Sequence, residues 1–273
     1  MIQIGCFQGS AGKGGILAAL ESAAEKGANV VQVFLSNPMS PKLRKIENSA
    51  QIQARARELG ISIYVHSPYT INLAKPPGEV DRQIAYMVSE LGLASSIGAK
   101  GCILHVGKSL GRSPETSHEF FVDAVRRIIS SPVGEARLIL ETAAGQGTEM
   151  YRDIRDLCSL LKSFGPEEKK RLGICADTCH VFAAGHTARE CIHEILSLPR
   201  ELHRCIHLNG SKKPRGSRVD RHEELDKGCL PKEEITEWIS FAREHKIPMI
   251  LETPDEERYA GYIEAIKRGN SIP

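Results

Sequence analysis

The sequence has little of what marks a membrane-spanning, secreted or disulfide-stapled protein. No run approaches the roughly 18 consecutive apolar residues of a transmembrane helix. The first residues, MIQIGCFQGS, carry no charged segment followed by an apolar stretch, so we expect no secretory signal. The cysteines form no CxxC motif, which argues against a cysteine zinc ribbon. We therefore expect a reduced, intracellular protein, in the cytoplasm or in a eukaryotic or viral setting in the nucleus, that does not bind membranes.

A large excess of charge of either sign is also missing. The 36 Lys and Arg residues and 34 Asp and Glu residues give a net charge of +2, which alone says little about partners. The distribution is uneven, because six basic residues and a single acid, Asp220, lie between Arg204 and His222. Such a basic patch suits a phosphate-bearing partner, and it equally fits a solvated loop. The proportions of 41% hydrophobic and 26% charged residues exclude disorder of the whole chain.

Short apolar, β-branched runs alternate along the chain with segments of helical spacing such as SAQIQARAREL and EEITEWISFAREH. Eight repeats of a strand–helix unit in 273 residues predict an α/β protein with the closed (β/α)₈ TIM barrel fold. A doubly wound open sheet is the alternative. We expect one domain over residues 1–273 and a monomer. The strand-like runs are 2–6, 30–35, 61–65, 101–105, 138–141, 173–177, 205–209 and 248–252.

The last residues of these runs share one chemical property. Six of the eight runs finish with a side chain that ligates divalent metals, although polar side chains are poor choices for the end of an apolar run. In a barrel the carboxyl ends of all strands converge on one face, where unpaired carboxylates would repel one another without a cation. These six side chains are His66, His105, Glu141, Asp177, His207 and Glu252.

Two local patterns add further ligands. In DTCH, Asp177 and His180 are three residues apart, and in VDRHE, Asp220 and His222 are two apart, so each pair can face one pocket. Imidazoles and carboxylates without thiolates favour Zn²⁺, Mn²⁺ or Fe²⁺. The nine candidates exceed the four or so ligands that one zinc takes, so two or three metals are implied. Sites of this kind suit in-line displacement at phosphorus.

Five segments together resemble the endonuclease IV family of apurinic/apyrimidinic endonucleases, and the resemblance runs essentially from end to end. It implies a (β/α)₈ barrel and an enzyme that cleaves duplex DNA 5′ to abasic sites, leaving a 3′-hydroxyl and a 5′-deoxyribose phosphate. The segments are HSPYTINLA (66–74), LETAAGQG (140–147), ICADTCHVFAAG (174–185), HLNGSKKPRGSRVDRHEELDKG (207–228) and LETP (251–254).

The resemblance also implies a cluster of three zinc ions, with Mn²⁺ able to replace part of the zinc. The family's nine ligand positions fall on the nine residues found above. Glu141 would bridge two metals and position the attacking hydroxide, with His66 and His105 on one side. Asp177, His207 and Glu252 would lie on the other side, and the third metal would be held by His180, Asp220 and His222.

Damaged double-stranded DNA is the expected partner. Tyr69 stands where the family has a DNA-contacting aromatic residue, and the basic run would hold flanking phosphates. Three departures from the family concern the mouth of the barrel: Phe7 replaces a histidine, HVG (105–107) replaces HPG, and PMSP (38–41) replaces polar or arginine residues that probe DNA. We therefore expect the loop after Asn37 to contribute less than it does in relatives. The predicted phosphate contacts are Lys212, Lys213, Arg215 and Arg218.

Two other classes of protein compete with this interpretation. A sugar isomerase or epimerase on the same barrel typically holds one or two metals with Glu, Asp, His and Glu, a set that Glu141, Asp177, His207 and Glu252 would satisfy. The five additional ligands and the basic run argue against it. A catalytically dead DNA-binding module would be expected to have lost ligands, and none of the nine is missing.

Overall fold

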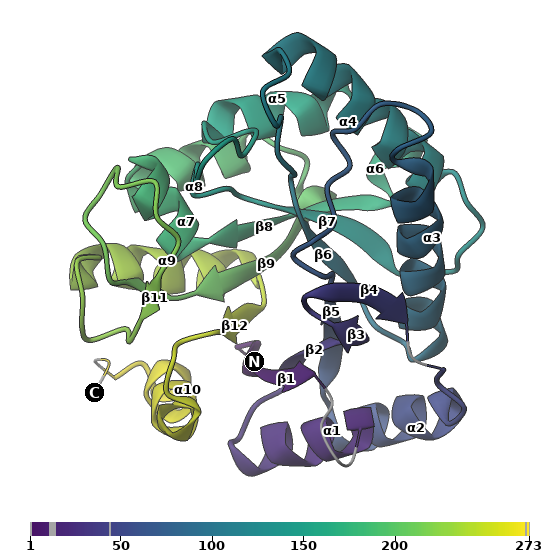
Figure 1. The fold of residues 1–273 in the computed structure, drawn as a ribbon. Helices are drawn as coiled ribbons and strands as arrows, with labels where there is room; N and C mark the ends of the chain where they lie inside the picture. Colours follow the sequence, from purple (N-terminus) through teal and green to yellow (C-terminus); the bar gives the residue numbers. More distant parts are fainter. Residues whose placement is uncertain (1, 11–14, 44, 271, 273) are drawn as a thin grey trace.

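Eight short parallel strands close on themselves in the computed structural model, which describes residues 2–10, 15–43, 45–270 and 272 (Figure 1). The hydrogen-bonded order is β1-β12-β9-β8-β7-β6-β5-β2, and β2 pairs with β1. The predicted barrel is therefore confirmed, and the open sheet is wrong. The strands are β1 (Ile4–Ser10), β2 (Val30–Phe34), β5 (Ser62–His66), β6 (Gly101–His105), β7 (Arg137–Glu141), β8 (Leu172–Asp177), β9 (His203–Leu208) and β12 (Met249–Leu251).

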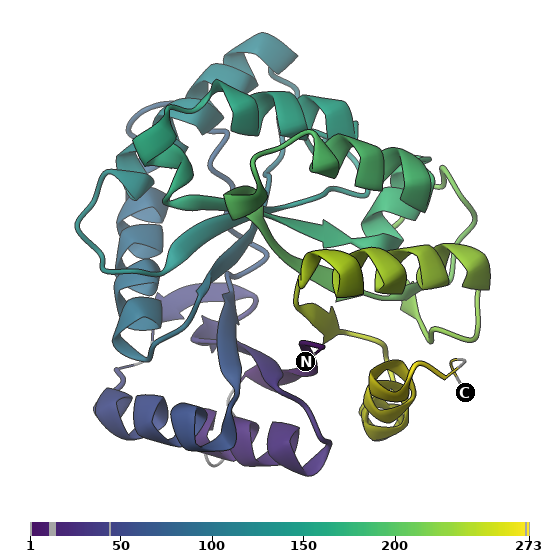
Figure 2. The same cartoon turned by 180° about the vertical axis from the view of Figure 1, so that it is seen from behind.

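Helices surround the strands on the outside of the barrel, as the two opposite views show (Figures 1 and 2). No helix among the described residues is long and apolar enough to cross a membrane. The helices are α1 (Gly15–Glu25), α2 (Ser49–Leu59), α3 (Asp81–Ser96), α4 (Pro114–Ile129), α5 (Ile154–Ser163), α6 (Pro166–Lys169), α7 (Thr178–Ala184), α8 (Ala188–Leu196), α9 (Lys232–His245) and α10 (Tyr259–Arg268), with short 3₁₀ turns η1 (Arg200–Leu202) and η2 (Glu256–Arg258).

Helix α4 illustrates how the sequence builds this outer layer. Ser113 caps its first turn by accepting a hydrogen bond from the Thr116 amide, and Pro114 occupies the first helical position, where no amide donor is needed. Apolar residues at helical spacing, including Phe121, Val125 and Ile128, are fully buried. Burial of this apolar face against the strands is what holds the helix in place.

The interior of the barrel is filled by a separate apolar layer. Seven strands each contribute one side chain, and β1 contributes Gly5, where a Cβ atom would lie 1.6 Å from the Val30 carbonyl oxygen. Only glycine fits at this close approach of two strands. The seven side chains are Val30, Tyr64, Ile103, Ile139, Cys175, Cys205 and Ile250.

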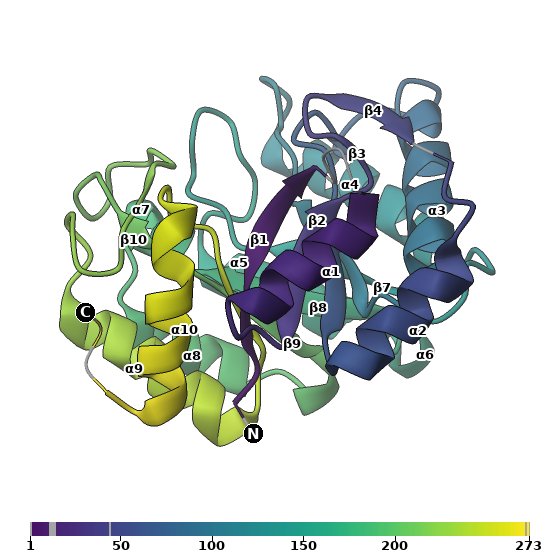
Figure 3. The same cartoon turned by 90° about the horizontal axis from the view of Figure 1, so that it is seen from below.

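Loops and two small antiparallel pairs rise from the carboxyl ends of the strands (Figure 3). One pair, β3 (Ser36–Asn37) with β4 (Ser40–Leu43), contains the PMSP segment, and the other joins β10 (Gly210–Ser211) to β11 (His222–Glu223). The predicted phosphate contacts from Lys212 to Arg218 lie in the loop between the two strands of the second pair. Both pairs therefore lie at the face where the candidate ligands converge.

A buried carboxyl group lies close to this face. Glu90 in α3 is fully buried, and its Oε1 accepts a hydrogen bond from the Tyr86 hydroxyl over 3.0 Å. Burial raises its pKa from 4.5 to about 7. Between these pH values the carboxyl group keeps its proton in the folded chain and loses it in the unfolded chain. The free energy of unfolding therefore decreases as the pH rises.

Replacing Glu90 with glutamine should remove this pH dependence. We expect Glu90→Gln to match the parent in free energy of unfolding at pH 5 and to exceed it at pH 8 by on the order of 2–3 kcal/mol. Urea unfolding at both pH values measures the difference. Glu119→Gln, at an exposed position of α4, is the control and should show no such change. An equal effect of Glu90→Gln on the free energy of unfolding at pH 5 and pH 8 would contradict a raised pKa of Glu90.

Candidate metal centre

The candidate ligands form the layer directly above the apolar interior. Side chains two residues apart on a strand face the same way. The residue two positions after each interior residue therefore points into the mouth of the barrel. The register supports this arrangement: His105 pairs with Glu141, and Asp177 pairs with His207. The eight positions of this layer are Phe7, Gln32, His66, His105, Glu141, Asp177, His207 and Glu252.

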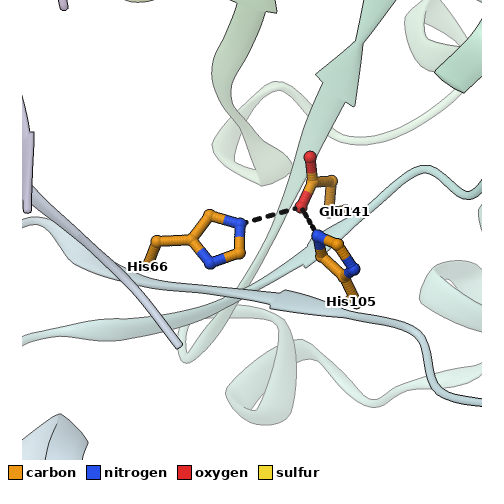
Figure 4. Close-up of side chains that lie close together, drawn as sticks. All are labelled: His66, His105 and Glu141. Carbon is orange, nitrogen blue, oxygen red and sulfur yellow. Dashed lines mark hydrogen bonds and ion pairs between the residues drawn. The ribbon is translucent and has the colours of Figure 1, made fainter. Parts of the chain in front are cut away.

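Glu141 lies at the centre of the cluster. The Nε2 atoms of His66 and His105 converge on one carboxylate oxygen, Oε2, at 3.2 and 3.0 Å (Figure 4). The other oxygen, Oε1, lies 2.8 Å from His207 Nδ1. Glu141 is 1% exposed, so its charge is compensated by these neighbours and by His180, whose Nδ1 lies 3.6 Å from Oε1. A carboxylate that offers one oxygen to each side has the geometry of a bridging ligand.

A second group surrounds His207 Nδ1. This nitrogen lies 3.1 Å from Glu252 Oε2 and 3.7 Å from Asp177 Oδ2, in addition to its contact with Glu141. His207 and Asp177 have no exposed surface. One imidazole nitrogen and three carboxylates therefore converge on a buried volume, which without a cation would hold an excess of negative charge.

A third group is built by the turn after β8 and by β11. Asp177 caps α7 by accepting a hydrogen bond from the His180 amide at 2.8 Å, which places the His180 ring beside the strand ends. His180 Nε2 lies 3.2 Å from Asp220 Oδ2, and His222 Nε2 lies 3.3 Å from Asp220 Oδ1. His222 Nε2 is also 3.6 Å from Asp177 Oδ2, which connects this group to the second.

Hydrogen bonds orient four of the five imidazoles so that the other ring nitrogen faces the carboxylates. His66 Nδ1 donates to the Ser67 carbonyl at 2.7 Å, His180 Nδ1 to Thr142 at 2.8 Å, and His222 Nδ1 to Glu252 at 3.2 Å. His207 is reversed, because its Nε2 donates to a side-chain oxygen and its Nδ1 faces the cluster. Metal-ligating histidines usually donate their second nitrogen in this way.

The ionisation of these groups reflects a demand for positive charge. Burial lowers the pKa of His207, but Glu252 and Glu141 outweigh burial and raise it to about 10. Burial also opposes a charged His180, and Asp177 with Asp220 nevertheless raises its pKa well above the usual range. In the same way, His105 and His207 overcome burial and hold the pKa of Glu141 well below its usual value.

The residues present fit divalent metals. The buried Nε2 atoms of His180 and His222 make no aligned hydrogen bond although each lies close to an Asp220 oxygen, as expected of nitrogen atoms that ligate a cation. All nine predicted ligands fall into groups whose donor atoms lie within 4.8 Å of one another. Cys175 and Cys179 each belong to one of these groups, and burial raises the pKa of both thiols, to about 12 for Cys179. The imidazoles and carboxylates are therefore the better ligands.

A cavity of about 430 Å³ opens above the cluster. Lys75 and Lys108 line it and add positive charge beside the ligands. Tyr69 stands at its rim, 50% exposed, with its ring 5.5 Å from the His66 ring and 5.4 Å from the His105 ring. Phe34 packs against Tyr69 and Phe7, so these three rings form an aromatic wall on this side.

The predicted phosphate contacts occupy two kinds of environment. Lys212, Lys213 and Arg218 are exposed on the loop between β10 and β11. Arg215 is half-buried, forms an ion pair with Glu234 in α9 and lies 4.5 Å over the Phe182 ring. The first three side chains are free to reach a partner, whereas Arg215 ties the loop to the barrel.

Two polar residues of the centre had no place in the predicted ligand set. Gln32 is fully buried in the ligand layer and hydrogen-bonds both His207 and Glu252. Asn209 donates to Asp177 Oδ2 at 2.7 Å and accepts from the Glu252 amide at 3.0 Å. A signal for Gln32 was present in the sequence, since it is the one polar residue in the apolar run VVQVFL, two positions after an interior valine.

The fold and the ligand layer define this protein as a barrel of the xylose isomerase-like TIM barrel class, and that family matches residues 20–271. The chain is 33% identical over 251 residues to the probable endonuclease 4 of Symbiobacterium thermophilum, covering 88% of this chain and 90% of the relative. It is 30% identical to the probable endonuclease 4 of Bacillus subtilis, and the match covers 93% of this chain and 88% of that relative. The chain therefore belongs to the endonuclease IV family.

Solved structures agree with this assignment. The structure of endonuclease IV from Thermus thermophilus superimposes with a TM-score of 0.80 at 26% identity, covering 97% of this chain and 98% of that one. A D-tagatose 3-epimerase-like protein also superimposes, with a TM-score of 0.73 over 97% and 96% of the chains. Its identity of 15% shows a shared fold alone.

Proposed function

We propose that this chain is a zinc-dependent endonuclease of DNA repair that hydrolyses the phosphodiester on the 5′ side of an abasic site in duplex DNA. The products would be a 3′-hydroxyl and a 5′-deoxyribose phosphate. The observation that carries the proposal is the convergence of nine imidazole and carboxylate groups, Glu141 among them, in a chain whose relatives are named endonuclease 4.

Three metals would be held by the three groups described above. Glu141 would bridge the first and second, His66 and His105 would complete the first, and the remaining residues would divide between the second and third. Zinc fits a donor set of imidazoles and carboxylates, and manganese fits part of it. Bound metals of this kind lower the pKa of water to about 7 and neutralise charge that develops on phosphate oxygens.

The protein's own side chains would bind and orient the substrate. Lys75 and Lys108, which line the cavity, would attract the phosphate to be cleaved, and the exposed Lys212, Lys213 and Arg218 would hold flanking phosphates. Phosphate contacts carry no sequence information, which suits an enzyme that must act at damage in any sequence. Arg215 would support this surface by fixing the loop to Glu234.

Recognition of the lesion would depend on the rim of the cavity. Tyr69 and Met39 are both large, apolar and exposed, at 50% and 68%, and the Tyr69 amide donates to the Pro38 carbonyl at 2.9 Å. The tip of the β3–β4 hairpin is thus fixed beside Tyr69. We infer that these side chains enter the gap that a missing base leaves in the stack, so the hairpin contributes through Met39 rather than through a charged probe.

A sugar isomerase or epimerase is the competing function. The group formed by Glu141, Asp177, His207 and Glu252 would satisfy it alone. The remaining ligands have no role in a one-metal or two-metal isomerase, yet they lie within the same cluster. The count of metals therefore separates the two functions.

Metal analysis combined with an incision assay tests the proposal. We expect about three zinc ions per chain after reconstitution, and cleavage of an abasic duplex on the 5′ side. Removal of the metals with a chelator should eliminate incision, and added Zn²⁺ should restore it. A fully active chain that holds one metal, or a reconstituted chain that does not cut the abasic duplex, would reject the proposal.

A further inference from the structure

We propose that Gln32 is a positioning residue for the metal centre, because its amide selects the atoms of His207 and Glu252 that face the metal. The inference rests on the metal centre proposed above. It concerns a neutral side chain in the ligand layer that is not itself a predicted ligand.

Gln32 reaches across the mouth of the barrel. It extends from β2, whereas its two partners stand on β9 and β12 on the other side of β1. Its Nε2 lies 2.6 Å from Glu252 Oε1, and its Oε1 lies 2.8 Å from His207 Nε2. The side chain has no exposed surface, so water does not replace either hydrogen bond.

The polarity of this arrangement is determined by the partners. A carboxylate only accepts hydrogen bonds, so the amide NH₂ of Gln32 must face Glu252 and the amide oxygen must face His207. His207 Nε2 therefore carries the proton and donates it to Gln32. In the neutral imidazole that ligates a metal, the lone pair of His207 is then on Nδ1, the atom that lies 2.8 Å from Glu141 Oε1 and 3.1 Å from Glu252 Oε2.

The same contact selects the oxygen of Glu252. With Oε1 occupied by the Gln32 amide, Oε2 is the oxygen that faces His207 Nδ1 and the second group of ligands. One amide thus assigns both the ligand nitrogen of an imidazole and the ligand oxygen of a carboxylate. A residue with only a donor or only an acceptor would fix one of them.

Among the four ligand histidines whose second nitrogen is hydrogen-bonded, His207 is the one held by a side chain. His66, His180 and His222 donate to backbone carbonyls, which substitution does not remove. His207 is also the one that presents Nδ1 rather than Nε2 to the cluster. Loss of Gln32 should therefore weaken one metal position and leave the others intact.

The experiment compares Gln32→Met and Gln32→Glu with the parent chain. Methionine has a similar length and neither donor nor acceptor of comparable strength, whereas glutamate keeps the acceptor for His207 and places a second carboxylate against Glu252. Val33→Ala is the control for general destabilisation, since Val33 is equally buried on the same strand but packs in the outer core cluster. Each metal-free protein is titrated with Co²⁺, whose visible absorption reports its ligands, and its Zn²⁺ affinity is measured by competition with a chromogenic chelator. Thermal midpoints are recorded in parallel.

We expect Gln32→Met to bind one of three ions about 10–100-fold more weakly and to change the Co²⁺ spectrum of that ion. Gln32→Glu should also weaken one ion, because its carboxylate repels Glu252. Val33→Ala should lower the thermal midpoint while keeping the parent affinities.

Parent affinities in Gln32→Met would overturn the proposal, and parent affinities in Gln32→Glu would overturn the part that concerns Glu252. Equal weakening of all ions, reproduced by Val33→Ala, would also reject it. A parent chain that binds no metal would reject both the metal centre and the role of Gln32, whereas three ions in the parent with no effect of Gln32→Met would reject Gln32 alone.

Discussion

Glu141→Ala is expected to reduce incision of an abasic duplex by at least about 1,000-fold, because it removes the group on which two sets of ligands converge. His66 and His105 meet one oxygen of this carboxylate, and His207 meets the other. Loss of both oxygens separates the two sets. Since a metal is worth several kcal/mol of transition-state stabilisation, losing the shared ligand should affect turnover far more than substrate binding. Single-turnover kinetics measure the loss of turnover, and elemental analysis of the same sample measures the loss of metal.

Glutamine at this position separates the charge of Glu141 from its shape. Glu141→Gln should retain more metal than Glu141→Ala, because an amide oxygen still ligates, but it should remain impaired because it supplies one acceptor instead of two. Glu115→Ala, which removes an exposed carboxylate at the start of α4, should behave as the parent. Retention of three metals and normal incision in Glu141→Ala would contradict the bridging role. A covalent protein–DNA intermediate would show that a protein nucleophile acts instead.

The ligand layer could be predicted from the sequence because it follows from one periodicity. In a strand that alternates between the barrel interior and the helices, a polar residue two positions beyond an interior apolar residue must point into the mouth. His105 and Glu141 satisfy this rule in the sequence and lie in register in the structure. In DTCH a second cause brings the two side chains together, because Asp177 caps the helix that carries His180.

Contacts that span the barrel could not be predicted in this way. The partners of Gln32 are 175 and 220 residues away in sequence, and only closure of the barrel brings them within reach. Arg215 was predicted to contact phosphate from its place in a basic run, but its neighbour Glu234 belongs to a helix that periodicity does not position relative to the loop. The β3–β4 hairpin could not be predicted either, since strands of two and four residues are too short to show an alternation of apolar and polar residues.

Tyr69→Ala is expected to reduce incision of an abasic duplex by about 10–100-fold, because base–aromatic stacking is worth about 1–3 kcal/mol. An abasic site offers no base to hydrogen-bond, so the enzyme must detect a gap in the stack, where extrusion of the sugar costs least. Tyr69 stands at the rim of the cavity with half of its surface exposed, and its position is fixed by Phe34 and by the hydrogen bond to Pro38. Met39→Ser should give a smaller loss, since the methionine lacks a ring.

Two comparisons separate insertion into the duplex from support of the metal ligands. The Tyr69 ring contacts the His66 and His105 rings, so its removal could disturb the metals directly. A small phosphodiester that requires no extrusion reports that effect, and we expect Tyr69→Ala to hydrolyse it at the parent rate. Tyr69→Phe should preserve incision, because the ring rather than the hydroxyl fills the gap. Leu196→Ala, which removes another exposed apolar side chain from α8, should leave both substrates unaffected. Equal losses of Tyr69→Ala on both substrates, or no loss on either, would reject insertion and leave Tyr69 as a packing residue beside the metal centre.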